Sequence, residues 1–243
     1  METSAPAAMP TSPGGSPKPW GLPAVLLALV VPALLLFPGL FLDVPEDLST
    51  GETVASLVGT LVLKDALFIG IAAGFAIWRY RLGWESLGLR PFDRNLWWWP
   101  LVAAAGALAA VMAYSAVLIA LGADEAAPQQ EDLEEILGDR AALPLAALAI
   151  VFVAPLSEEI FFRGFIFGGL IRPFGPTGAM LATGLLFGAF HVTGVDSLGV
   201  VLPFSLIGAL FAWLYYRTGS LWPAIATHFL FNVVGFTGGV LAN

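Results

Sequence analysis

The sequence predicts an all-α, polytopic transmembrane helical bundle of about seven to eight spans. The chain of 243 residues is 58% hydrophobic and only 12% charged, whereas an average soluble domain is nearer a quarter charged. Apolar runs of about 20 residues, which is the length that crosses a bilayer, recur along it. The loops between these runs are too short for a second, soluble domain, so residues 20–243 are expected to form a single integral-membrane domain.

The expected elements follow from the apolar runs of the chain and from the proline residues and polar loops that interrupt them. Residues 1–19 are rich in Pro, Ser, Gly and Ala, which predicts a disordered tail. A polar, acidic loop is expected at 43–52 and another at 124–140, where 131–137 indicates a short surface helix. Pro155 is expected to break or kink the fourth span, and a break would add an eighth helix. The seven predicted spans are 20–42, 54–78, 97–121, 143–171, 178–192, 198–216 and 221–241.

The basic residues predict the orientation of this bundle. Of the ten Lys and Arg, seven fall on one side of seven alternating spans, and only Arg140 falls on the other. All eight Trp lie near the same basic ends, and 12 of the 18 acids lie in three loops opposite. We therefore expect a bacterial plasma-membrane protein with a cytoplasmic N-terminus and the C-terminus outside, or inside if Pro155 breaks the chain. The seven basic residues are Lys18, Arg79, Arg81, Arg90, Arg94, Arg172 and Arg217.

Composition also excludes some classes of function. No basic patch exists, so nucleic acid is not an expected partner. The chain has no cysteine, which excludes thiol nucleophiles and cysteine-ligated metals. The expected partners are membrane lipid and a peptide or membrane-protein substrate.

Three ionisable residues, Glu158, Glu159 and Arg163, lie in the middle of the fourth predicted span. Such groups are costly in hydrocarbon and usually mark a functional site. Glu159 and Arg163 are four residues apart, so they share a helix face and can form a supporting ion pair. Glu158 points about 100° away. Its carboxylate is expected to remain free and to suit a general base.

The only two histidines of the chain lie on separate later spans. Phe187 and His191 share one helix face, and so do His228 and Asn232, because each pair is four residues apart. His and Asn side chains can donate to a developing oxyanion, although a hydrogen bond between helices would use the same groups. The glutamates and histidines lie at comparable depths, which makes one shared site plausible.

Two further features predict contacts between helices rather than chemistry. Lys64 and Asp65 are adjacent, so they do not share a helix face, and each is expected to pair with another helix or to reach outward. Gly184-x-x-x-Gly188 predicts a close packing face.

The three motifs together are similar to those of the CPBP intramembrane protease family. Glu-Glu-x-x-x-Arg, Phe-x-x-x-His and His-x-x-x-Asn occur in that order on late spans, as in the type II CAAX prenyl endopeptidases and the bacteriocin-processing, Abi-like relatives. The resemblance covers about residues 143–243. It implies that Glu158 and His191 activate a water that attacks a scissile carbonyl. His228 and Asn232 would stabilise the oxyanion, while Glu159 and Arg163 hold the site together.

The resemblance leaves the cofactor open, because the family includes proteins described as metalloproteases and as metal-independent glutamate proteases. The expected cofactor is therefore either none or a single Zn²⁺ bound by Glu158, His191 and His228. Two other functions stay as alternatives. A catalytically silent scaffold or immunity protein would not need every polar residue, and a proton-coupled transporter often shows repeated halves, which this sequence does not.

Overall fold

The computed structural model describes residues 18–36, 50–123, 136–192 and 196–242. In these residues the regular elements are all helices, which confirms the predicted all-α class. The described part contains five helices long and apolar enough to cross a membrane, and the third of them is 47 residues long. Residues 1–17 of the predicted tail, the loop at 43–49 and most of the predicted helix at 131–137 lie outside the described residues. The five helices are Val54–Arg79, Arg94–Ala120, Leu143–Ala189, Ser197–Thr218 and Trp222–Leu241.

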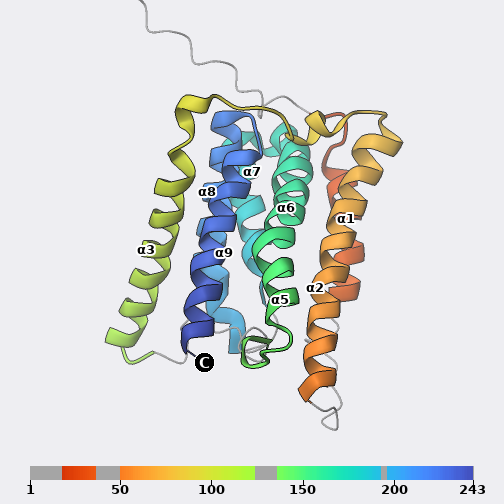
Figure 1. Cartoon of the computed structure of the whole chain (residues 1–243). Helices are drawn as coiled ribbons and strands as arrows, with labels where there is room; N and C mark the ends of the chain where they lie inside the picture. The colour runs from red at the N-terminus through yellow and green to blue at the C-terminus, as the bar shows by residue number, and fades with distance from the viewer. Residues whose placement is uncertain (1–17, 37–49, 124–135, 193–195, 243) are drawn as a thin grey trace, which may run out of the picture.

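The first helices alternate in direction, as Figure 1 shows. Helix α1 (Leu22–Leu36) is followed by α2 (Thr50–Ala73), which continues as the π-helical η3 (Gly74–Arg79). Two short 3₁₀ helices, η4 (Trp84–Leu87) and η5 (Arg94–Leu96), then lead into α3 (Trp99–Ala120). These elements correspond to the first three predicted spans.

The long helix is built from five consecutive elements, and it carries the glutamate pair. Its backbone stays helical through Pro155, so, of the predicted break or kink, the break that would have added a helix is wrong. Wider π-helical turns flank the proline, and such turns accommodate a missing backbone hydrogen bond. The elements are α5 (Leu143–Ala147), η7 (Leu148–Val153), α6 (Ala154–Glu158), η8 (Glu159–Phe167) and α7 (Gly168–Ala189).

The chain reverses instead at Gly175, inside α7, where φ is 67° and ψ is 172°. Only glycine adopts this conformation readily. Pro173 and Pro176 on either side disfavour a continuous helix as well. The reversal separates the fourth and fifth predicted spans, in the interval between residues 171 and 178 where the sequence placed a loop.

Helix α7, which carries Phe187 of the second motif, packs closely against α8. After η9 (Asp196–Val200), α8 (Val201–Thr218) and α9 (Trp222–Ala242) complete the bundle. A Cβ atom on Gly184 would lie 2.5 Å from the Ser205 carbonyl oxygen, and one on Gly208 would lie 2.9 Å from Cβ of Phe187. The predicted packing role of the Gly184–Gly188 face is therefore confirmed.

The two ends of the bundle differ in charge. In Figure 1 the α2–α3 connection, the reversal at Gly175 and the α8–α9 turn lie at the upper end, with the first described residues. The seven basic residues of the predicted inner side belong to these segments or lie next to them. The beginning of α2, the beginning of α5 and the end of α9 lie at the lower end.

Candidate active site

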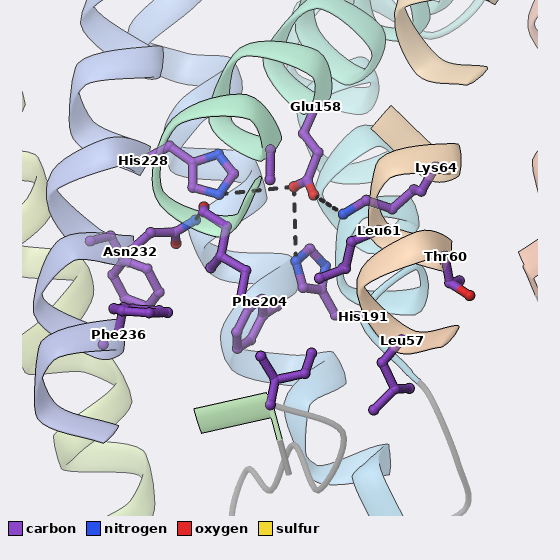
Figure 2. Close-up of a pocket in the computed structure, with 15 residues that line it drawn as sticks. Leu57, Thr60, Leu61, Lys64, Glu158, His191, Phe204, His228, Asn232 and Phe236 are labelled. Atoms are coloured by element: carbon purple, nitrogen blue, oxygen red, sulfur yellow. Dashed lines mark hydrogen bonds and ion pairs between the residues drawn. The ribbon is translucent and has the colours of Figure 1, made fainter. Parts of the chain in front are cut away.

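The three predicted motif segments meet at one cavity of about 250 Å³. Glu158 from α6, His191 after α7, and His228 and Asn232 from α9 all line it, as Figure 2 shows. A fifth polar side chain, Lys64 from α2, lines the same cavity. The convergence that the sequence made plausible is thus present in the structure.

Glu159 and Arg163 form the predicted ion pair behind this cavity. Nη1 of Arg163 donates to Oε1 of Glu159 at 2.7 Å, and both side chains are fully buried. Nη2 of Arg163 donates to the Gly208 carbonyl at 3.0 Å, which ties η8 to α8. The guanidinium carbon lies 4.4 Å from the centroid of the Phe187 ring and 5.1 Å from that of Phe211. The pair therefore links η8, α7 and α8.

Replacing Arg163 with Ala is expected to destabilise the fold strongly. The change leaves the buried Glu159 carboxylate without its counter-ion, and breaking a buried pair in this way costs about 3–5 kcal/mol. Thermal unfolding of the purified protein in detergent measures the loss. Arg172→Ala is the matched control because Arg172 is exposed. Equal stability of the two variants would contradict a supporting role for the Glu159–Arg163 pair.

Glu158 has a partner that the sequence analysis did not assign to it. Nζ of Lys64 donates to Oε1 of Glu158 at 2.5 Å, so the expectation of a free carboxylate is wrong for that oxygen. Oε2 of Glu158 is buried and has no hydrogen-bond partner. The hydroxyl of Ser157, the residue before Glu158 on α6, donates to Oδ1 of Asp65 at 2.6 Å. Lys64 and Asp65 thus both pair with α6, as predicted for residues that contact another helix.

Lys64 is the functional candidate that motif reasoning missed. It lies far from the three motifs in sequence, and only Lys64 and Arg163 of the ten basic residues lie within predicted spans. That position inside a span was the available signal, since a charge in hydrocarbon needs a partner. Its side chain is 16% exposed.

The hydrogen bonds of the two histidines determine which ring nitrogen carries the proton. Nδ1 of His191 lies 2.7 Å from the Phe187 carbonyl oxygen, and Nδ1 of His228 lies 3.1 Å from Oε1 of Glu159. Both partners can only accept, so each Nδ1 carries hydrogen and each neutral ring presents the lone pair of Nε2. The backbone and the structural ion pair therefore orient both imidazoles.

Both Nε2 atoms face the unpaired oxygen of Glu158. Each lies 3.9 Å from Oε2, as the dashed lines in Figure 2 indicate. This separation is too long for a direct hydrogen bond. Three acceptor atoms thus surround one small volume beside the cavity, and a water molecule there can donate to Oε2 and to one Nε2. The arrangement is suited to binding and deprotonating water.

Asn232 lies at the same cavity with one amide hydrogen already used. Its Nδ2 donates to the Ile150 carbonyl oxygen of η7 at 2.8 Å. An amide nitrogen has two hydrogens, so the second one can donate to a group bound in the cavity. The bond to η7 fixes the direction in which that donor points.

The three side chains Glu158, His191 and His228 offer the types of atom that bind zinc, but these atoms are not placed as the ligands of one ion. Two imidazoles and a carboxylate, with the Nδ1 atoms held by acceptors, are typical zinc ligands. However, the described residues contain no group of three His, Cys, Asp or Glu side chains placed to hold a metal ion. The ammonium of Lys64 at 2.5 Å from Glu158 also repels a second cation. The described side chains thus supply the types of atom that bind zinc without being placed as its ligands.

The helical fold and the cluster formed by Glu158, His191 and His228 define a polytopic integral membrane protein with a buried carboxylate–imidazole centre. Residues 140–234 match the family model for type II CAAX prenyl endopeptidase Rce1-like proteins. The chain is also 34% identical over 104 residues to the "Putative membrane peptidase YdiL" of Bacillus subtilis (strain 168). The matched region is therefore similar to the Rce1-like family of type II CAAX prenyl endopeptidases, in agreement with the resemblance drawn from the three motifs.

The extent of these matches is limited to the C-terminal part of the chain. The alignment with the Bacillus protein covers 43% of this chain and 41% of the relative, so the chain spans about two fifths of that relative's length. No solved structure matches the chain. The family match contains all seven motif residues from Glu158 to Asn232, whereas Lys64 lies outside it.

Proposed function

We propose that this chain is an intramembrane endopeptidase that hydrolyses a peptide bond with a water activated by Glu158. The observation that carries the proposal is the convergence of Oε2 of Glu158 and both histidine Nε2 atoms beside one cavity. Glu158 is only 3% exposed. A buried carboxylate oxygen without a hydrogen bond, facing two imidazole lone pairs, is the chemistry expected of a general base.

The proposed reaction begins with a water held between Oε2 of Glu158 and Nε2 of His191. Glu158 takes one proton from this water as its oxygen attacks the carbonyl carbon of the scissile bond. The tetrahedral intermediate then collapses, and the carbon–nitrogen bond breaks. The proton on Glu158 passes to the leaving amine, so the products are a carboxylic acid and an amine, and the carboxylate is restored.

His228 and Asn232 are proposed to stabilise the oxyanion of that intermediate. Asn232 has its second amide hydrogen for this purpose. Nδ1 of His228 donates to Oε1 of Glu159, which points Nε2 toward the cavity, and Nε2 donates to the oxyanion when the ring carries a second proton. Donors aimed at a developing oxyanion contribute about 2.7–4 kcal/mol each in related chemistry.

Lys64 is proposed as a positioning residue. Its ammonium holds Oε1 of Glu158, which turns Oε2 toward the histidines and compensates the buried negative charge. A fixed cation at this place supplies the positive charge that a metal supplies in a metalloprotease. We therefore propose the metal-independent form of the mechanism and route no step through zinc.

The test is reconstitution in lipid vesicles with a panel of candidate membrane-anchored peptides. His191→Ala and His228→Ala are each expected to reduce cleavage by about 10²-fold or more, because each removes a positioned proton acceptor or donor. Both variants should purify as folded protein, with the larger stability loss in His228→Ala, whose ring contacts Glu159. Wild-type activity in either variant would contradict the role given to that histidine.

The same assay tests the cofactor. Cleavage by the wild type is expected to persist after prolonged dialysis against a strong chelator, and metal analysis of the active protein is expected to find less than one equivalent of zinc. Activity lost to the chelator and restored by Zn²⁺ would overturn the metal-independent mechanism. Absence of cleavage across the panel by wild type and variants alike would favour the catalytically silent alternative.

A further inference from the structure

His191 follows the end of a helix, so the packing around its ring determines where the imidazole points. Helix α7 ends at Ala189, and the backbone N–H of His191 donates to the Gly188 carbonyl oxygen at 3.2 Å in the turn that follows. The ring itself is bonded through Nδ1 to the Phe187 carbonyl oxygen. One hydrogen bond fixes the position of Nδ1 but leaves the tilt of the ring, and with it the direction of Nε2, to the neighbouring side chains.

Two phenyl rings form a corner around this imidazole. The ring centroids of Phe187 and Phe204 each lie 4.5 Å from the centroid of the His191 ring, which is the range of direct ring contact. The two phenyl centroids are 6.5 Å apart, so the directions from His191 to the two rings are nearly perpendicular. The imidazole is thus held in the corner with Nε2 at 3.9 Å from Oε2 of Glu158.

The close approach of α7 and α8 brings Phe204 to this place. Phe204 lies in the first turn of α8 and belongs to none of the three motifs. A Cβ atom on Gly188 would overlap Oγ of Ser205 and the Val201 carbonyl oxygen. The start of α8 therefore lies against the end of α7 because Gly188 has no side chain. This contact carries the Phe204 ring onto His191, three residues after the glycine.

Phe204 is also part of the cavity wall. It lines the cavity together with His191 and with Phe231 of α9. Its ring meets the Phe231 ring edge-on, with centroids 6.3 Å apart. In Figure 2, Phe204 lies between His191 and the labelled residues of α9. The Phe204 ring is therefore in contact with the imidazole and with the space that a substrate would occupy.

We propose that Phe204 positions His191 and limits the size of the substrate side chain that fits beside the scissile bond. A misplacement of about 1 Å at a reacting centre reduces the rate by about a hundredfold, so an imidazole free to leave its corner would hold the water poorly. The water lies between Glu158 and His191, so the side chains next to the attacked carbonyl lie close to the Phe204 ring. The size limit rests on the proposed function, whereas the positioning of His191 does not.

The positioning is directly measurable because the chain has only two histidines. The full chain is labelled with ¹⁵N in its histidine rings, and the ring ¹⁵N chemical shifts report which nitrogen carries hydrogen. The wild type is expected to show hydrogen on Nδ1 of both rings. In Phe204→Ala the His191 signals should broaden or move toward the average of the two tautomers. The His228 signals should stay in place, because Glu159 holds that ring, and the spectrum of His191→Ala assigns them.

Two further variants make this measurement decisive. Phe204→Leu keeps most of the apolar bulk and should change the His191 signals in the same direction by a smaller amount, so the test does not depend on the folding of Phe204→Ala. Leu202→Ala is the matched control, since Leu202 lies in the same turn of α8 and is exposed, and it should leave both histidines unchanged. Unchanged His191 signals in Phe204→Ala and Phe204→Leu would overturn the positioning role.

The size limit is tested in the vesicle assay with a peptide that the wild type cleaves. The residues on either side of its scissile bond are changed to Ala or to Trp. Phe204→Ala is expected to lower kcat for the Ala peptide by about tenfold with little change in KM. The ratio of kcat/KM for the Trp peptide to that for the Ala peptide should rise by about tenfold, because a ring-sized space opens. Leu202→Ala should change neither quantity.

The possible failures of this test are distinguishable. The same Trp-to-Ala ratio in Phe204→Ala and in the wild type would overturn the size limit. No cleavage of any peptide by the wild type would overturn the proposed function and the size limit with it. The ring signals of His191 decide the positioning role in either case, because they do not depend on cleavage.

Discussion

Glu158→Gln is expected to reduce cleavage by about 10²–10⁴-fold, which is the contribution of a positioned general base. Glutamine has nearly the same size as glutamate, and its amide oxygen still accepts the hydrogen bond from Lys64. It cannot take a proton from water at neutral pH. The turnover number should therefore fall while binding of the peptide changes little. The stability loss should be smaller than that of Lys64→Met, because Lys64 is 16% exposed and keeps Asp65 at 3.9 Å. Single-turnover cleavage in vesicles measures the effect.

Two other glutamates serve as controls for this substitution. Glu85 is exposed on η4, so the Glu85→Gln variant should cleave the peptide as fast as the wild type does. Glu159→Gln weakens the ion pair with Arg163 and the contact with His228, so it should lower stability more than Glu158→Gln does. The two adjacent carboxylates are thus expected to give opposite phenotypes. Full activity in Glu158→Gln would exclude it as the general base.

Spacing within one helix predicted the internal geometry of each motif. Residues four apart share a face, and the Glu159–Arg163 ion pair and the contact between the Phe187 and His191 rings follow from that rule. The rule also separated Glu158 from its neighbour. It could not give the distance between motifs, because tilt and rotation of three helices determine whether their polar faces meet.

Contacts between helices of distant sequence position were not predictable in detail. The pairing of Lys64 with Glu158 depends on how α2 is rotated relative to α6. No pattern in the sequence predicts this rotation. The bond from Asn232 to the Ile150 carbonyl depends in the same way on the packing of α9 against η7. The sequence indicated only that a charge inside a span needs a partner.

The location of the chain reversal shows how proline and glycine act together. Pro155 alone looked like a break, but wider π-helical turns on either side keep the chain helical. At Gly175 the left-handed backbone conformation, with prolines two residues before and one residue after it, reverses the chain. A single proline within a membrane helix is thus a weaker signal than a glycine flanked by prolines.

Lys64→Met is expected to reduce cleavage by about 10–100-fold, the usual cost of removing a group that orients a catalytic residue. It should also lower the free energy of unfolding by about 3 kcal/mol, because the Glu158 carboxylate is left buried without its cation. Val62→Met is the matched control, since it places the same residue on the exposed face of α2 and should change neither quantity.

The double variant Lys64→Met/Glu158→Gln separates positioning from general loss of structure. Removing both charges leaves no unpaired ion, so the double variant should regain most of the stability lost by Lys64→Met. Its cleavage should stay as low as that of Glu158→Gln, because Lys64 acts only through that carboxylate. Additive losses in activity would mean that Lys64 contacts the substrate itself. Additive losses in stability would mean that the two side chains do not depend on each other in the folded protein.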